Sequence, residues 1–165
     1  MDYTELGRTG LLVSVAGLGC GGNSKIGQGM GQSVSDSVKL VRIALDLGVN
    51  FLDTAQSYGT ERIVGEAIKT VPRDQVVIST KHTAENVSAE RISSAIDDAL
   101  RELNTEYIDI FHLHGVHPRQ YDHALSELAP ALLRARDAGK IRFLGITETS
   151  PNDHSQTMLQ QAIRD

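Results

Sequence analysis

The sequence is poor in cysteine, aromatic residues and long apolar runs. It has one cysteine, Cys20, no tryptophan and only 4% aromatic residues. A single cysteine cannot form an internal disulfide, which is typical of proteins from a reducing compartment. No apolar run approaches the roughly 20 residues that a membrane-spanning helix needs, and residues 1–5 do not begin a secretory leader. These absences predict a soluble, cytoplasmic chain without a membrane partner.

The charge of the chain is mildly acidic. It has 16 lysine and arginine residues against 21 aspartates and glutamates, for a net charge of -5. Basic clusters with interleaved aromatics, which follow a phosphate backbone, are missing, so nucleic acid is not an expected partner. The length of 165 residues fits one domain over 1–165, and a chain of this size buries roughly 70% of the surface that its unfolded form exposes.

Short β-branched runs alternate with longer amphipathic segments, which is typical of a parallel sheet covered by helices. Strand ends are predicted near Cys20, Asp53, Lys81, His114 and Thr147, at spacings of 33, 28, 33 and 33 residues. This regularity indicates a repeated βα unit. Eight such units form a (β/α)8 barrel of about 250 residues. The five units here therefore predict an α/β fold of TIM-barrel type that is incomplete, with a doubly wound five-stranded sheet as the rival.

Other segments surround this repeat. Residues 3–6 and 11–15 flank Gly7-Arg8-Thr9-Gly10 and predict a β-hairpin that closes the lower end of the barrel. The glycine-rich segment 21–35 is interpreted as a mobile loop. Apolar spacing and capping residues predict the helices, which we place at about 36–47, 60–70, 88–103, 122–138 and 155–163.

Reactive side chains stand at the ends of three consecutive predicted strands. Asp53 ends the first and is followed five residues later by Tyr58, Lys81 ends the second, and His114 ends the third. Alternation along each strand places Asp53, Lys81 and His114 on faces that can point into a barrel. The carboxyl rim of a barrel hosts its chemistry, and Tyr58 on the next loop can lean over that rim. A carboxylate beside a phenol indicates proton transfer.

A second pattern, Gly17-Leu18-Gly19-Cys20-Gly21-Gly22, matches the dinucleotide fingerprint letter for letter. A fingerprint should open a helix, and the acid expected about 20 residues later should end a strand. Asp53 lies 31 residues past Gly22, and further glycines follow the motif. We interpret the pattern as a turn and a loop.

Several motifs in the same order resemble the aldo-keto reductases. They are the hairpin Leu6-Gly7-Arg8-Thr9-Gly10-Leu11, the runs Phe51-Leu52-Asp53-Thr54-Ala55 with Tyr58-Gly59, Ser79-Thr80-Lys81, Tyr107-Ile108-Asp109-Ile110-Phe111 with Leu113-His114, and Gly139-Lys140-Ile141-Arg142. The resemblance implies a catalytic tetrad of Asp53, Tyr58, Lys81 and His114. It also implies NADP or NAD as cofactor, a small carbonyl or sugar substrate, and a cofactor site that includes Gly21, Asp53, Thr147 and Glu148. The run Gly145-Ile146-Thr147-Glu148 is similar to a sugar-dehydrogenase-like branch.

The chemistry of these residues agrees with that implication. Reduction of a carbonyl by hydride transfer generates an alkoxide, which needs a proton donor. Tyr58 would be the general acid in reduction and the base in oxidation. Its ordinary pKa near 10 should be lowered by Lys81, whose ammonium Asp53 would hold, while His114 would donate a hydrogen bond to the substrate oxygen.

Two other functions remain open. One is a truncated partial barrel that serves as a binding or partner subunit, because the resemblance places the cofactor phosphates on loops after a seventh and an eighth strand. Its open sheet edges would then favour self-association. A metal-dependent barrel hydrolase using His112 and His114 is the other alternative. It is disfavoured because Lys81 would repel the cation, so no metal is expected.

Three polar residues near these motifs are given structural interpretations. Glu61 is expected to be an ordinary residue of a first helical turn, and Asp109 an outward strand residue that pairs with a neighbouring helix or loop. His82 is expected at the surface. None of them is assigned to the site.

Overall fold

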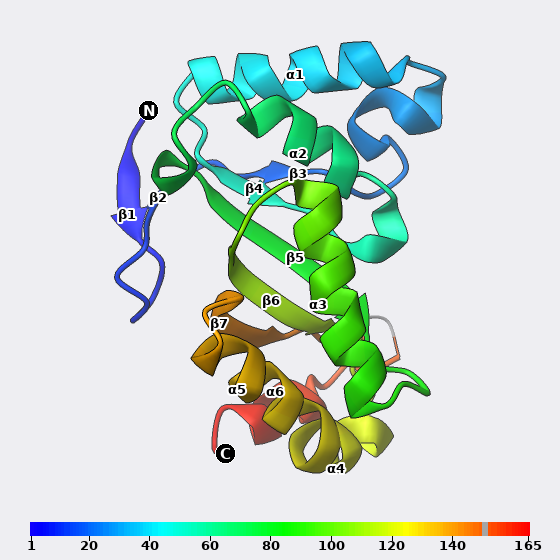
Figure 1. Ribbon diagram of the computed structural model, residues 1–165. Coiled ribbons are helices and arrows are strands. Elements are labelled where there is room, and N and C mark those ends of the chain that lie inside the picture. The colour runs from blue at the N-terminus through cyan, green and yellow to red at the C-terminus, as the bar shows by residue number, and fades with distance from the viewer. Residues whose placement is uncertain (150–151) are drawn as a thin grey trace.

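The computed structural model describes residues 1–149 and 152–165 (Figure 1). The strands are β1 (Tyr3–Glu5), β2 (Leu12–Ser14), β3 (Leu18–Gly19), β4 (Phe51–Asp53), β5 (Val77–Thr83), β6 (Ile108–His114) and β7 (Ile141–Ile146). The α-helices are α1 (Val34–Asp46), α2 (Glu61–Ile68), α3 (Ala89–Leu103), α4 (Tyr121–His123), α5 (Ala129–Asp137) and α6 (Thr157–Ala162). Shorter 3-10 or π segments are η1 (Lys25–Met30), η2 (Gln56–Tyr58), η3 (Arg73–Gln75), η4 (Pro118–Gln120) and η5 (Ala124–Leu128).

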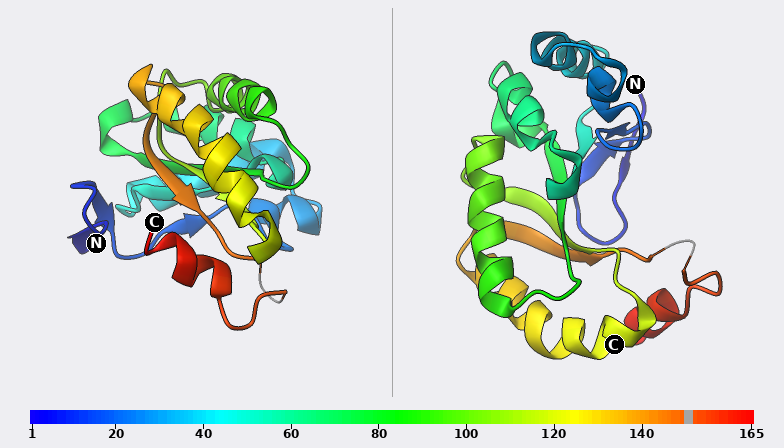
Figure 2. Two further views of the ribbon diagram at one scale, coloured as in Figure 1. Left: turned by 90° about the horizontal axis from the view of Figure 1, so that it is seen from below. Right: turned by 90° about the vertical axis from the view of Figure 1, so that its right-hand side faces the viewer.

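Strands β3 to β7 form one parallel sheet in chain order, β3-β4-β5-β6-β7. A doubly wound sheet reverses its strand order at a switch point, so the uninterrupted order excludes that rival. The sheet curves, and helices α1, α2, α3 and α5 follow its convex side as an arc (Figure 2). The fold is therefore an incomplete (β/α) barrel of five βα units, as predicted.

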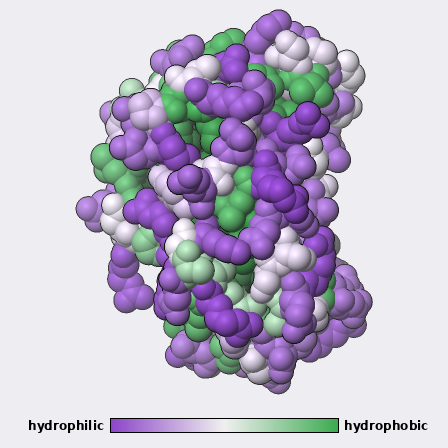
Figure 3. All heavy atoms as spheres, viewed as in Figure 1, coloured by the Kyte–Doolittle hydropathy of each residue, from purple (hydrophilic) through white to green (hydrophobic). Residues whose placement is uncertain are grey.

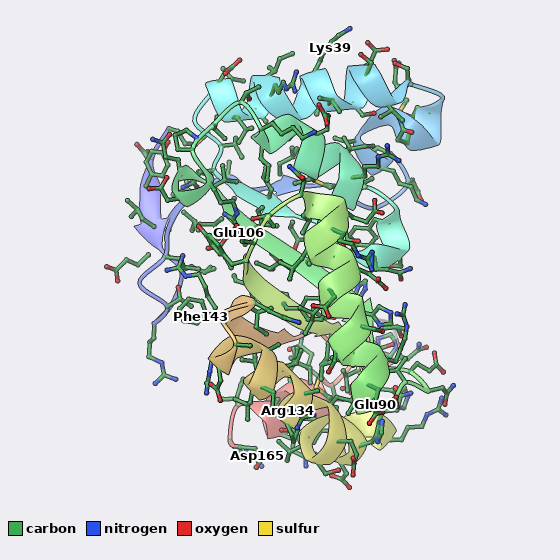
Figure 4. The ribbon with its side chains drawn as sticks, in the orientation of Figure 1. Lys39, Glu90, Glu106, Arg134, Phe143 and Asp165 are labelled. Carbon is green, nitrogen blue, oxygen red and sulfur yellow. The ribbon has the colours of Figure 1, made fainter. Side chains whose placement is uncertain are left out.

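The predicted hairpin is also present. Strands β1 and β2 pair antiparallel with Tyr3 opposite Ser14, and Gly7 and Gly10 in the turn have positive φ angles of 56° and 70°. The apolar side chains of the hairpin cover the amino ends of the sheet strands, where Leu11 and Val13 pack with Val77, Ile110 and Phe143. Figure 4 shows Phe143 extending from β7 toward the hairpin. The lower end of the barrel is thus closed by a small apolar cluster.

Local capping and one apolar face explain the helices. In α3, the Ser88 hydroxyl accepts from the backbone N–H of Arg91, and Asn104 ends the helix in the left-handed conformation. The buried face of α3 consists of Ile92, Ala95, Ile96, Ala99 and Leu103. Toward solvent, the helix layer is predominantly hydrophilic (Figure 3). Apolar burial between helices and sheet holds this layer in place.

The expected loop 21–35 is more structured than its composition indicates. It contains η1, and Ile26 within η1 is only 4% exposed because it joins the main apolar core. The mobile-loop interpretation was wrong for this part of the segment. The helix expected at 122–138 is present but is built from α4, η5 and α5 in succession, with η5 a π-helical turn. Of the helices in the two described stretches, none combines the length and apolarity that a bilayer crossing requires.

One buried carboxylate joins three strands near their amino ends. Asp109 of β6 is 1% exposed and accepts from Arg73 at 2.7 Å, from Arg142 of β7 at 2.8 Å, and from the backbone N–H of Ile78 in β5 at 3.0 Å. The expected pairing with a neighbouring loop is confirmed by Arg73. The same contacts show that Asp109 also connects β6 to both neighbouring strands.

We expect Asp109→Ala to lower the free energy of unfolding by about 3 kcal/mol, because it leaves two arginine charges without their buried partner. Denaturant unfolding monitored by circular dichroism measures this change. Asp98→Ala is the matched control, since Asp98 is exposed and pairs with Arg91 and Arg101 at the surface. Its cost should stay below about 1 kcal/mol. Equal losses in the two variants would contradict a structural role for the Asp109 network.

Candidate active site

The predicted site residues lie on the concave face of the sheet near its carboxyl rim. Asp53 is the last residue of β4, and Lys81 and His114 stand near or at the ends of β5 and β6. In the sheet register, Asp53 is opposite Ser79 and Lys81 is opposite His112. Residues of the other parity, such as Leu52, Ile78 and Phe111, join the core under the helices. The predicted alternation of inward-facing site residues and outward-facing core residues along the strands is confirmed.

Lys81 and Asp53 form the central ion pair. The Lys81 Nζ atom lies 2.6 Å from each carboxylate oxygen of Asp53 and donates to the Thr54 carbonyl at 2.8 Å. Ser79 Oγ donates to Asp53 Oδ1 at 2.7 Å. Lys81 is 7% exposed, so the ammonium charge is buried and fully partnered. Asp53 therefore both fixes and neutralises the lysine.

Tyr58 lies over this pair from η2. Gly59 ends the turn with φ of 71°, a conformation that suits glycine. The ring centroid of Tyr58 is 5.2 Å from Lys81 Nζ, and the rings of Tyr58 and His114 meet edge to face with centroids 5.7 Å apart. The structure thus brings Asp53, Tyr58, Lys81 and His114 together at one place on the rim.

The electrostatics of Tyr58 differ from the expectation. Burial first, and the negative charge of Asp53 second, raise the pKa of Tyr58 above its ordinary value. The expected lowering by Lys81 is not found: Asp53 binds the ammonium through both carboxylate oxygens and adds its own negative charge near the phenol. Burial and then Lys81 lower the pKa of His114. At neutral pH the phenol is therefore protonated and the imidazole of His114 is neutral.

His112 comes two residues before His114 on β6, so its side chain also points to the concave face. Its ring covers Gly145 of β7 so closely that a Cβ atom there would be 2.1 Å from His112 Nδ1. That nitrogen is buried and has no hydrogen-bond partner among the residues that the structure describes. Burial first, and Lys81 second, lower the pKa of His112 to about 4. His112 is thus a neutral lining residue.

The metal alternative concerned His112 and His114. Within residues 1–149 and 152–165, no group of three or more histidine, cysteine, aspartate or glutamate side chains could hold a metal ion. His117, which lies near His114 in the sequence, instead caps η4, where its Nδ1 accepts from the backbone N–H of Arg119 at 3.3 Å. His112 lines the concave face against Gly145, and His114 contacts the ring of Tyr58.

The residues expected at the cofactor lie at both ends of the rim. Gly21 follows β3 and faces the ring of Tyr58. Thr147 follows β7, where its Oγ1 accepts from the backbone N–H of Gly115 at 2.8 Å and its backbone N–H donates to the Leu113 carbonyl at 3.0 Å. Glu148 is half-buried beside it. The glycine pattern opens no helix at once, since α1 begins only at Val34, which agrees with its interpretation as a turn.

Two neighbouring residues are more buried than expected, although Glu61 does lie in the first turn of α2. Glu61 is 7% exposed, and its Oε1 accepts from Thr80 Oγ1 at 2.6 Å on the helix side of β5. Burial is the main reason that the pKa of Glu61 is raised. His82 is 5% exposed rather than at the surface. The residues next to Lys81 on both sides are therefore packed under the helices, which helps to fix the lysine.

Comparison with known proteins matches residues 17–164 to the Aldo/keto reductase family. The chain is 39% identical to L-galactose dehydrogenase of Arabidopsis thaliana over 157 residues, which are 89% of this chain and 48% of that protein. It is 35% identical to aldo-keto reductase YhdN of Bacillus subtilis over 164 residues, which are 91% of this chain and 48% of that protein.

A solved structure gives the same result. The holo form of aldo-keto reductase AKR11C1 from Bacillus halodurans superposes with a TM-score of 0.77 at 30% identity, covering 94% of this chain and 53% of that one. The chain spans about half the length of the curated relatives named above.

The buried His112 should make stability depend on pH. Its folded pKa of about 4 lies below the ordinary 6.5, so the unfolded chain binds a proton in this interval that the folded chain does not. Above pH 6.5 His112 is neutral in both states and the fold keeps its full stability. As the pH falls toward 4, protonation of the unfolded chain lowers the free energy of unfolding. After allowance for partial exposure, this loss amounts to about 2 kcal/mol.

Comparison of His112→Gln with the wild type by urea unfolding at several pH values measures this term. The difference in unfolding free energy should change between pH 6.5 and 4 and stay constant above 6.5. His154→Gln, at an exposed position, is the control and should run parallel to the wild type. A parallel His112→Gln curve would mean that the ring titrates normally.

Proposed function

Since the chain belongs to the aldo-keto reductase family, we propose that it carries out NAD(P)-dependent reduction of small carbonyl compounds, or the reverse oxidation of alcohols. The substrate class is aldehydes, ketones or sugars. The observation that carries this proposal is the meeting of Asp53, Tyr58, Lys81 and His114 on the carboxyl rim. The name of the relative L-galactose dehydrogenase favours sugars within that class.

Tyr58 is the proposed proton donor in reduction. Its raised pKa keeps the phenol protonated at neutral pH, which is the form that a general acid needs. His114, held neutral, has one ring N–H to donate to the substrate oxygen, and its edge-to-face contact with Tyr58 places the two rings side by side at the rim. The proton moves from the phenolic oxygen to the alkoxide oxygen as that charge develops.

Lys81 and Asp53 have a supporting role in this proposal. Lys81 lies beneath the tyrosine ring, and Asp53 and the Thr54 carbonyl occupy its hydrogens. A phenolate formed on Tyr58 would be stabilised by the ammonium and opposed by the carboxylate. In this proposal the carboxylate disfavours ionisation of the tyrosine before substrate arrives, and the ammonium, 5.2 Å from the ring centroid, keeps a positive charge beside the ring during the transfer.

Thr147 and Glu148 fit the carboxamide of a nicotinamide by their hydrogen-bonding chemistry. Thr147 Oγ1 already accepts from Gly115, so its hydroxyl hydrogen remains available for a carbonyl oxygen. The Glu148 carboxylate can accept from an amide nitrogen. We assign both, with Gly21 and Asp53, to the cofactor site. When bound, the nicotinamide supplies the hydride that these side chains cannot.

The alternative is that the chain is a partner subunit with little activity of its own. Two observations favour it: the chain spans about half the length of its curated relatives, and β3 and β7 each lack a second neighbour in the described sheet. Unpaired edge strands favour association with another chain. In this case the tetrad is present but turnover requires a second polypeptide.

We expect Tyr58→Phe to lower the rate of cofactor oxidation at least about 100-fold with a responsive aldehyde, ketone or sugar, because the proton donor is lost. Absorbance of the reduced nicotinamide measures the rate. Tyr107→Phe is the matched control: Tyr107 precedes β6 at the end of the strand opposite the rim, so its rate should equal that of the wild type. Equal rates in wild type and Tyr58→Phe would remove the proposed acid.

Fluorescence titration with reduced nicotinamide cofactor separates the enzyme from the partner subunit. An active site should bind the cofactor saturably, and Thr147→Val should weaken binding because it removes the free hydroxyl. Sedimentation of the same samples reports association through the sheet edges. Absence of cofactor binding at millimolar concentration would contradict the proposal that the chain is an enzyme. A monodisperse monomer in sedimentation would contradict association through the sheet edges.

A further inference from the structure

We propose that Gly21 is a positioning residue for Tyr58, because the absence of a side chain there creates the place in which the tyrosine ring lies. A Cβ atom built on Gly21 would lie 2.5, 2.7 and 2.8 Å from three carbons of the Tyr58 ring. Such distances are far inside van der Waals contact. The ring therefore lies flush against the backbone of Gly21, and any other residue at this position must displace it.

Two members of the tetrad lie on other sides of the ring. Lys81 Nζ lies 5.2 Å from the ring centroid, and the His114 ring meets it at an interplanar angle of 86°. Gly21 is thus one wall of a slot whose other walls are two members of the tetrad. A ring pushed away from Gly21 moves against Lys81 and His114 unless it turns toward solvent.

The backbone of Gly21 cannot retreat either, because the preceding residue is tied to both ends of the tyrosine loop. The backbone N–H of Cys20 donates to the Asp53 carbonyl at 2.7 Å, and the Cys20 carbonyl accepts from Thr60 Oγ1 at 3.0 Å. Cys20 itself is fully buried. The end of β3 is therefore locked to the segment that carries Tyr58.

A pair of buried hydroxyls closes the base of the same loop. Thr54 Oγ1 and Thr60 Oγ1 are 2.9 Å apart, and both residues are buried, at 0% and 1% exposure. The Thr60 hydroxyl donates its only hydrogen to the Cys20 carbonyl, so the Thr54 hydroxyl is the donor in the bond between the two threonines. The loop from 54 to 60 is thus held at its two ends against β3, and Tyr58 stands between them.

This arrangement predicts how a methyl group at Gly21 acts. Displacement of the ring toward solvent removes the burial that raises the Tyr58 pKa, so the phenol should titrate nearer its ordinary value. If the proposed function holds, the misplaced acid should lower kcat more than it changes KM, by about 100-fold for a displacement of 1 Å.

Gly19 provides a matched control two residues away. A Cβ atom at Gly19 meets no heavy atom of the described chain within 4 Å, and neither glycine has a left-handed φ. Gly19→Ala therefore adds the same methyl group two residues earlier, at the end of β3, without touching the tyrosine. Any general effect of alanine on this part of the chain is shared by the two variants.

The test is carbon-13 NMR of the whole chain labelled at the tyrosine ring. The chain has four tyrosines, and the resonance lost in Tyr58→Phe identifies Tyr58. Gly21→Ala should shift this resonance and lower the midpoint of its pH titration, whereas Gly19→Ala should leave both unchanged. An unshifted Tyr58 resonance in folded Gly21→Ala would overturn the proposal, as would equal shifts in the two variants.

A second pair of variants decides the matter if Gly21→Ala does not fold. Thr60→Val removes the hydroxyl that ties the loop to Cys20, and Thr60→Ser retains it. The Tyr58 resonance should shift or broaden in the valine variant and be restored in the serine variant; no shift in Thr60→Val would overturn the loop anchoring. These readouts need no turnover. If Tyr58→Phe reduces as fast as the wild type, the proposed function fails while the NMR result still decides the position of the ring.

Discussion

The ion pair between Lys81 and Asp53 is the interaction on which the site depends. It joins the ends of β4 and β5, and a third contact from Lys81 to the Thr54 carbonyl extends it into the loop that carries Tyr58. A buried ammonium is costly unless all its hydrogens are partnered, and here they are. The pair also contributes to the electrostatics, because the charge of Asp53 adds to burial in raising the pKa of Tyr58.

The two faces of the sheet carry different kinds of residues: the candidate catalytic side chains lie on one, and buried structural contacts lie on the other. On the concave face stand the tetrad and His112. On the convex face, Glu61 meets Thr80, and Asp109 meets Arg73 and Arg142. Because Thr80 is the residue before Lys81, the alternation of a strand couples a buried hydrogen bond under α2 directly to the orientation of the lysine.

Much of the fold and site could be predicted because strand spacing and alternation are local patterns. They placed Asp53, Lys81 and His114 on one face at one rim. The pKa of Tyr58 could not be predicted in the same way, since its direction depends on burial and on how Asp53 meets Lys81. Glu61 resembled an ordinary first-turn residue because its partner Thr80 is 19 residues away. The contact between Gly21 and Tyr58 could not be predicted, because the sequence shows only a glycine at position 21 and gives no sign of its neighbour.

The hairpin has a consequence for the order of folding. Each βα unit contacts chiefly its neighbours along the chain, so these units can form from contacts that are local in sequence. Leu11 and Val13, by contrast, pack on Ile110 and Phe143, which come about 100 and about 130 residues later. The part of that surface formed by Ile110 and Phe143 exists only after β6 and β7 have joined the sheet. Asn50 already binds the hairpin next to β4, so full burial of Leu11 and Val13, rather than first contact of the hairpin, requires the whole sheet.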